Sequence, residues 1–187
     1  MSRRWVLWLG MAVTVAASAA GVAVGTAIAL FAPTVAHAQA NALTPAQVAA
    51  IEKEVTAALH NYYRLYTEKD ARALGGEVFL EPWIQLGNNG PQVTTTAPAE
   101  SSKRFAENIK RLEEQGWVKS EYPKPIVCVI NASTAIASGE FMRYRKDGSI
   151  LSVNGTSYLF GKTAAGWRIV SFFGHERGKV ITCNDGV

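Results

Sequence analysis

The sequence contains few of the residues that build metal sites and nucleophile sites. It has three histidines and two cysteines in 187 residues. Beyond residue 40 the histidines are His60 and His175, and neither stands at the paired spacing with cysteines or carboxylates that a zinc site requires. No glycine-rich phosphate loop occurs, and "GTSYL" (155–159) lacks the second glycine of a G-x-S-x-G nucleophile elbow. We therefore expect no metal and no cofactor.

A large excess of one charge is also missing. The chain has 19 lysines and arginines against 15 aspartates and glutamates, a formal net charge of +4. Arg3 and Arg4 belong to the N-terminal segment described next, so 17 basic and 15 acidic residues leave +2 for the remainder. A nucleic-acid-binding domain usually carries a strong basic excess on one face. The composition therefore argues against a nucleic-acid partner.

The one long uncharged run lies at the N-terminus. Arg3 and Arg4 precede an uncharged stretch over residues 5–31, which is followed by a proline and small-residue A-x-A sites. This order is typical of a secretory signal peptide, and we expect cleavage after Ala38. The paired arginines also fit a twin-arginine signal. We expect a periplasmic or secreted protein; the alternative is an inner-membrane anchor, since about 20 apolar residues suffice to cross a bilayer.

The remainder, residues 39–187, has the length of a single domain and ends in a short tail from about residue 177. It contains both cysteines, Cys128 and Cys183, and an even number in an oxidising compartment indicates a disulfide. The alternative is that Cys128, inside the apolar run "IVCVI", is an ordinary buried thiol. The sequence leaves these two interpretations open.

A long amphipathic helix is predicted at the start of this domain. Thr44 is placed as its N-cap and Pro45 takes the first helical position. Its apolar residues recur every three or four positions and form one stripe: Val48, Ile51, Val55, Leu59, Tyr62 and Tyr66. Asp70 can cap a second, shorter helix. The stripe predicts that the long helix packs one face against a core.

A third helix is predicted from Pro98 to about Gly116. Its inward positions are Phe105, Ile109 and Leu112. Its charges pair at four-residue spacing, as in Glu107 with Arg111. We interpret these charges as a solvated face.

The rest of the chain is predicted to form strands. Asn89-Gly90 between "WIQLG" and "QVTTT" indicates a hairpin, because both central positions of a type I′ turn favour positive φ. Four strands follow: "PIVCVINAS", "TAIASGEFMRYR", "SILSVNGTSYLFG" and "WRIVSFFGHE". Helices followed by a mostly antiparallel sheet indicate an α+β fold.

The pattern as a whole resembles the nuclear transport factor two-like superfamily, over about residues 44–176. The resemblance rests on "YYRLYTEKD" at the end of the first helix, on the closing meander "FMRYRKDGSILSVNGTSYLFGKTAAGWRIVSFFGHE", and on the order helix, helix, hairpin, helix, strands. It implies a cone-shaped, curved, mostly antiparallel sheet wrapped around the long N-terminal helix, with two further helices. It also implies a pocket at the open end of the cone, and a homodimer formed through the sheet.

The same superfamily contains ketosteroid isomerase, scytalone dehydratase and polyketide cyclases. Ketosteroid isomerase works with an aspartate base and an oxyanion hole made by a tyrosine and a protonated acid. Tyr62 is similar in position to the tyrosine of that enzyme. The spacing from Asp70 to Glu81 is shorter than the family's spacing to the base, and the second acid has no match. The resemblance therefore supplies one candidate catalytic residue and an incomplete catalytic set.

The last predicted strand ends in a histidine beside a glutamate, His175 and Glu176, which could be read as a catalytic pair. Side chains alternate along a strand, so His175 shares a face with Ile169 and Phe173, while Glu176 lies on the other face. His175 and Glu176 therefore form no simple dyad. His175 is then either a rim residue or an acid or base at the mouth of the pocket.

We expect the ligand site to be lined by Tyr62, Tyr66, Trp83, Phe173 and His175. Packing in the core is the alternative role of the aromatic residues among them. Glu140 and Arg143 lie on opposite faces of one strand, so one of the two points into the pocket.

Three functions follow as hypotheses. The first is an exported domain that binds a small hydrophobic or amphipathic molecule, or self-associates through its sheet, without catalysis. The second is an isomerase, dehydratase or cyclase that uses Tyr62 as donor and His175 as base. The third is a structural envelope protein held by an uncleaved N-terminal helix.

Overall fold

The computed structural model describes residues 42–87 and 90–183. The predicted signal peptide of residues 1–38, its cleavage site, the turn residue Asn89 and the last four residues of the tail lie outside the described residues. Within the described ranges, no helix combines the length and the hydropathy needed to span a bilayer.

Helix α1 (Pro45–Thr67) begins where the sequence predicts. The Thr44 hydroxyl accepts a hydrogen bond from the backbone N–H of Gln47 at 3.3 Å, and the Gln47 side chain accepts one from the Thr44 N–H at 2.8 Å. This reciprocal capping box satisfies two helix N–H groups that have no partner inside the helix. The buried residues of α1 are Ile51, Val55, Leu59, Tyr62, Tyr63, Leu65 and Tyr66.

Two shorter helical segments and α3 pack beside the end of α1. Asp70 caps α2 (Ala71–Ala73) by accepting from the Ala73 N–H at 2.9 Å, as predicted, and the π-helical segment η1 (Leu74–Val78) follows. Helix α3 (Pro98–Glu114) buries Phe105, Ile109 and Leu112, the three predicted inward positions. A Cβ on Gly75 would lie 2.3 Å from Ser102 Oγ, so glycine allows η1 to approach α3 closely.

Seven strands form one sheet in the order β2-β1-β7-β6-β5-β3, with β4 also paired to β5. Their bounds are β1 Phe79–Gly87, β2 Gly90–Thr95, β3 Trp117–Glu121, β4 Ile126–Asn131, β5 Thr134–Arg145, β6 Ile150–Thr163 and β7 Gly166–His175. The β1–β7 pair is parallel and the other pairs are antiparallel. Strand β3 was not predicted, because its five residues carry too little alternation to be recognised.

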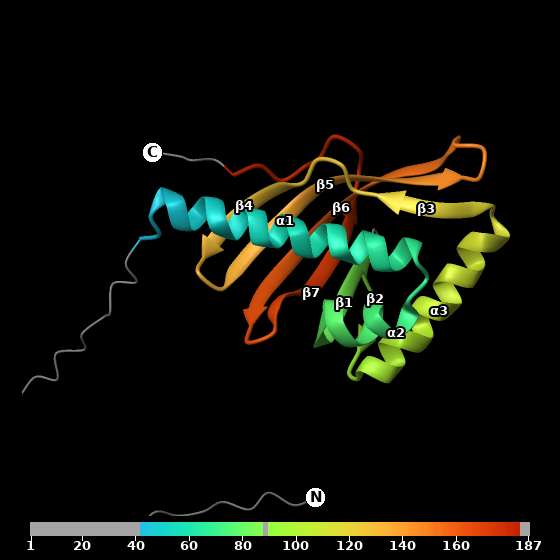
Figure 1. Cartoon of the computed structure of the whole chain (residues 1–187), viewed down its shortest axis with the longest axis horizontal. Helices are drawn as coiled ribbons and strands as arrows, with labels where there is room; N and C mark the ends of the chain where they lie inside the picture. Colours follow the sequence, from blue (N-terminus) through green and yellow to red (C-terminus); the bar gives the residue numbers. More distant parts are fainter. Residues whose placement is uncertain (1–41, 88–89, 184–187) are drawn as a thin grey trace, which may run out of the picture. The chain divides into compact units, whose positions relative to one another are not determined.

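The sheet is curved, and α1 lies across one of its faces, with α3 beside α2 (Figure 1). We call the face that packs on α1 the inner face. Its aromatic residues form one cluster with α1, in which the Tyr62 ring has five neighbours at centroid distances of 5.0–6.4 Å: Tyr63, Tyr66, Phe79, Phe105 and Tyr158. The α+β fold, with a curved and mostly antiparallel sheet around a long helix, is therefore confirmed.

A β-bulge in β7 changes which side chains reach the inner face. Phe160 pairs with Ile169, but the preceding Leu159 pairs with Ser171, so Val170 is the extra residue. Strict alternation would place Ile169 and Phe173 on one face. The bulge instead puts Ile169 and Phe172 on the inner face and leaves Phe173 on the outer face.

The C-terminal tail is attached to the outer face of β4 and β5. Cys128 and Cys183 form a disulfide with their Cα atoms 5.3 Å apart, which decides between the two interpretations of Cys128. The Ile181 N–H donates to Ser138 Oγ at 2.9 Å, and the Gly178 N–H donates to Glu140 Oε1 at 3.0 Å. The tail is thus held by one covalent bond and by polar contacts.

Candidate ligand-binding cavity

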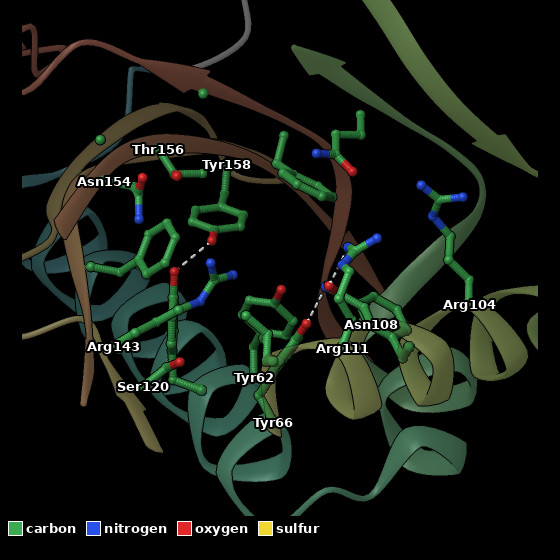
Figure 2. A pocket seen from close by; sticks show the side chains of 18 of the residues that line it. Tyr62, Tyr66, Arg104, Asn108, Arg111, Ser120, Arg143, Asn154, Thr156 and Tyr158 are labelled. Carbon is green, nitrogen blue, oxygen red and sulfur yellow. Dashed lines mark hydrogen bonds between the residues drawn. The ribbon is translucent and has the colours of Figure 1, made fainter. Parts of the chain in front are cut away.

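A cavity of about 650 Å³ lies between α1, α3 and the inner face of the sheet (Figure 2). Pockets of roughly 300–1,000 Å³ are the usual size of small-molecule sites. Helix α1 contributes Tyr62, Tyr63 and Tyr66 to its lining, and α3 contributes Arg104, Glu107, Asn108 and Arg111. Its wall on the sheet includes Ser120, Phe141, Arg143, Asn154, Thr156 and Tyr158.

The tyrosines present hydroxyl groups to this space. Tyr63 and Tyr158 are hydrogen-bonded through their hydroxyls at 2.7 Å. Tyr66 accepts a hydrogen bond from Asn108 Nδ2. Among the residues drawn in Figure 2, the Tyr62 hydroxyl has no such partner. The α1 side of the cavity therefore combines aromatic rings with phenol groups that can bind a polar ligand atom.

These phenols stay protonated at neutral pH. Desolvation by burial raises the pKa of Tyr62 and Tyr63 well above the usual tyrosine value, raises that of Tyr66 to about 12, and raises that of Tyr158. The positive charge of Arg143 opposes part of the rise at Tyr62, Tyr66 and Tyr158. The guanidinium therefore lies within electrostatic reach of three phenols that act as neutral hydrogen-bond donors.

Arg143 enters the cavity from β5, which lies between β6 and β3 in the sheet. It shares the inner face with Phe141, and its guanidinium carbon lies 5.0 Å from the centre of the Phe141 ring. Its Nε is buried and has no hydrogen-bond partner in the described part of the chain. None of the five ion pairs between described residues includes Arg143. Of the two residues that the sequence left open, Arg143 faces the cavity and Glu140 holds the tail on the outer face.

The third helix supplies a polar wall. Arg111 Nη2 donates to Asn108 Oδ1 at 2.7 Å, which orients the Asn108 amide so that its Nδ2 donates to Tyr66. The predicted pairing of Glu107 with Arg111 is absent from the ion pairs of the described residues. Our interpretation of these charges as a solvated face is incomplete, because Arg104, Glu107 and Arg111 are exposed and also line the cavity.

His175 lies at the end of β7, opposite Gly155 of β6. Its Nδ1 is 2.8 Å from the Glu176 carbonyl oxygen, which can only accept, so Nδ1 carries the proton of this contact. Its Nε2 is buried and has no partner among the described residues. His175 borders the cavity at the end of β7, but its side chain lies on the outer face with that of Phe173, because a Cβ on Gly155, which would point to that face, would lie 2.4 Å from His175 Nδ1. Its contact with Glu176 runs through the backbone rather than the carboxylate.

The other predicted site residues divide into two groups. Tyr62, Tyr66 and Trp83 line the cavity, whereas His175 borders it with its side chain on the outer face. The Trp83 indole N–H donates to Ser101 Oγ at 2.7 Å, so its polar atom is used within the protein. Phe173 requires a correction: the β-bulge places it on the outer face, and Phe172 lines the cavity in its stead.

The polar residues of α3 that line the cavity were not predicted from the sequence. Arg104, Asn108 and Arg111 stand at i, i+4 and i+7, which is itself a helical stripe, next to the apolar stripe of Phe105, Ile109 and Leu112. This helical spacing of the three polar residues was the signal from which their common face could have been predicted. No group of three or more histidines, cysteines or carboxylates that could hold a metal ion occurs within residues 42–87 and 90–183.

A curved antiparallel sheet that closes on a long helix and encloses a cavity defines the class of NTF2-like α+β domains. The sequence pattern of one family of this class, described as NTF2-like protein (DUF6841), matches residues 52–177, and the chain belongs to that family. No curated protein matches the chain at a significant level.

Solved structures with the same fold come from several bacteria. An NTF2-like protein with a cystatin-like fold from Novosphingobium aromaticivorans is 22% identical, with a TM-score of 0.56, over 76% of this chain and 88% of that one. An NTF2-like superfamily protein from Salmonella enterica is 17% identical, with a TM-score of 0.52, over 75% and 99%. An NTF2-like protein of unknown function from Shewanella oneidensis is 13% identical, with a TM-score of 0.53, over 66% and 98%. At these identities the likeness concerns the fold.

Proposed function

We propose that this protein binds a small amphipathic molecule in the cavity between α1, α3 and the sheet. The observation that carries the proposal is the lining itself, in which tyrosine and phenylalanine rings surround the buried Nε of Arg143, a donor without a partner among the described residues. Apolar walls with a few convergent polar groups are typical of small-molecule sites. The aromatic rings supply contact area, and the donors orient the ligand.

Native mass spectrometry of the protein purified from its own host tests this proposal. A retained small molecule that is released on denaturation is the expected result. A variant that fills the cavity, Asn154→Trp, provides the comparison, because Asn154 is exposed and lines the cavity. Asn61→Trp is the matched control, because Asn61 is exposed on α1 and lies outside the cavity lining. Equal retention by the two variants would place the molecule elsewhere and refute the proposal.

Catalysis is a second candidate function, because Tyr62 lines the cavity and His175 borders it. A reaction of the isomerase, dehydratase or cyclase type would use Tyr62 as donor and His175 as base. The test is nuclear magnetic resonance of the extracted molecule before and after incubation with fresh protein. Conversion that is lost in both Tyr62→Phe and His175→Ala would support catalysis, and an unchanged spectrum would argue for binding alone.

We also propose that the domain works in the periplasm or after secretion. The order of residues 1–38 and the pairing of both cysteines support export, because disulfides persist in oxidising compartments. Fractionation of the native host, with determination of the mature N-terminus, tests this proposal. A mature chain that starts after Ala38 would support cleavage. A retained N-terminus in the membrane fraction would support the anchored alternative.

Self-association through the outer face of the sheet is a further proposal. Ile84 and Leu86 of β1 are 41% and 38% exposed, and Leu86 is paired with Phe173 on the same face. Adjacent apolar residues on an open sheet face are typical of contact surfaces. Analytical ultracentrifugation of the wild type and of Leu86→Glu tests it. A dimer that the variant dissociates is expected, and a monomeric wild type would refute it.

A further inference from the structure

The cavity is rich in positive charge and in donors, and this composition identifies one end of the ligand. Arg104, Arg111 and Arg143 line it, against one carboxylate, that of Glu107. None of the five ion pairs between described residues includes any of these four. The three arginines would repel a cationic ligand. A neutral ligand could accept hydrogen bonds from them but would not compensate their positive charge, which an anion does.

Of the three arginines that line the cavity, Arg143 is the one whose charge a bound anion would stabilise most. It is partly buried on the inner face of β5, lies against the Phe141 ring, and has a buried Nε without a described partner. Taking a guanidinium out of water is unfavourable unless a negative charge or several acceptors compensate it. The contact with the Phe141 ring compensates only part of that loss. A carboxylate matches the planar fork of arginine with two parallel hydrogen bonds.

The hydroxyls near Arg143 are also available as donors. Ser120, paired with Arg143 across β3 and β5, accepts a hydrogen bond from the Trp117 indole N–H at 2.9 Å. The indole can only donate, so the Ser120 hydroxyl proton remains free for another acceptor. Ser120 lines the cavity. A second donor thus stands next to the guanidinium.

The tyrosines of the cavity also have phenol protons that are free to donate. Tyr66 accepts from Asn108 Nδ2, so its own phenol proton is free. Tyr63 and Tyr158 share one hydrogen bond between two hydroxyls, which leaves one of their two protons unused in that contact. Figure 2 shows Tyr158, Arg143 and Tyr66 directed into the same space from β6, β5 and α1. The donors converge where acceptor atoms of a ligand would lie.

We propose that the ligand is an organic carboxylate with an aromatic or apolar body, whose carboxylate is held by Arg143. This inference rests on the proposed binding function and adds the chemical class of the ligand. The body packs against the rings of Phe105, Phe141 and Phe172, which line the cavity. The exposed Arg104 and Arg111 on α3 attract the anion towards the cavity, and their contribution falls with ionic strength.

Two matched compounds test this assignment: 2-naphthoate, and 2-naphthamide, which has the same rings and nearly the same shape but no charge. Their affinities for the purified mature protein are measured by isothermal titration calorimetry at constant ionic strength. We expect 2-naphthoate to bind roughly tenfold or more tightly than the amide, since hydrogen bonds to a charged group contribute about 1.5–3 kcal/mol. Arg143→Gln should remove this preference and leave the amide's affinity within about a factor of two.

Two variants serve as controls. Arg72→Gln removes an exposed arginine of α2 outside the cavity lining and should leave both affinities unchanged. Arg143→Lys keeps the charge but loses the planar fork, and should retain part of the preference for 2-naphthoate. Circular dichroism in the near ultraviolet verifies that each variant keeps its aromatic packing.

The outcomes separate the two proposals. Equal affinities for the acid and the amide, both abolished by Asn154→Trp, would preserve the binding function and overturn the carboxylate assignment. A preference for the acid that Arg143→Gln does not change would also overturn it, because the anion would then lie on other residues. Absence of binding, or binding that Asn154→Trp does not affect, would refute the binding function as well.

Discussion

The hydroxyl oxygens of Tyr63 and Tyr158 lie 2.7 Å apart and join α1 to β6 beside the cavity. Both rings are buried, and they come from segments 95 residues apart in the sequence. A buried hydrogen bond of this kind fixes the position of the helix on the sheet. It therefore links the stability of the fold to the shape of the cavity.

The first prediction concerns this contact. Tyr63→Phe or Tyr158→Phe should each lower the free energy of unfolding by about 1 kcal/mol, because each leaves the other hydroxyl without its partner. The double variant should be less destabilised than the sum, since both polar groups are then gone. Denaturant unfolding measures all three. Strict additivity would mean that the two hydroxyls do not interact in solution.

The second prediction is loss of stability at alkaline pH. The pKa of Tyr66 is about 12 in the folded protein, against about 10 for an exposed tyrosine, so the unfolded chain releases the phenol proton at a lower pH. The stabilisation is fully present below pH about 10 and is lost as the pH rises towards about 12. Tyr62, Tyr63 and Tyr158 shift in the same direction.

Denaturant midpoints measured across this pH range test the prediction. Lysines also titrate there, so Tyr66→Phe is the necessary comparison. The variant should lose less stability between pH about 10 and 12 than the wild type does. An identical decline in both proteins would assign the effect to other groups.

The sequence was sufficient to predict the fold because its local signals are strong. Thr44 and Pro45 begin α1, Asp70 caps α2, and the apolar stripe of α1 becomes the buried face. Each of these signals acts within a few residues along the chain. Strand β3 was missed because its five residues are held mainly by pairing with β5, which is a contact distant in sequence.

The site was less predictable, because it depends on register. A single extra residue in β7, Val170, moves Phe173 to the outer face and brings Phe172 to the cavity. Alternation from the sequence cannot reveal a bulge, since the bulge is a property of the strand pairing. Likewise Arg143 could be placed on one of two faces but not assigned to the cavity, because the curvature of the sheet decides which face is enclosed.

The third prediction concerns the glycine that accommodates His175. A Cβ on Gly155 would lie 2.4 Å from His175 Nδ1 and 2.7 Å from the His175 backbone oxygen, so the end of β7 must shift in Gly155→Ala. We expect a loss of about 1–3 kcal/mol in the free energy of unfolding, as for other overpacked positions. Gly76→Ala is the control, because a Cβ there meets no atom within 4 Å. A loss no greater than that of the control would show that His175 is displaced without strain.

The fourth prediction concerns the disulfide between Cys128 and Cys183. It closes a loop with a sequence separation of 55, and the chain-entropy treatment gives up to about 4 kcal/mol for a loop of this length. Reduction should therefore lower the denaturant midpoint of the wild type markedly. It should also release the tail, whose remaining contacts include the hydrogen bonds to Ser138 and Glu140.

The double variant Cys128→Ser with Cys183→Ser separates the bond from the effect of the reductant. Its midpoint should match that of the reduced wild type and should not change when reductant is added. Mass spectrometry of unreduced peptides verifies the bond itself. Two free thiols in protein purified from an oxidising compartment would contradict the pairing. A bonded wild type with an unchanged midpoint on reduction would mean that the tail opens independently of the sheet, so that the bond fixes the tail without stabilising the core.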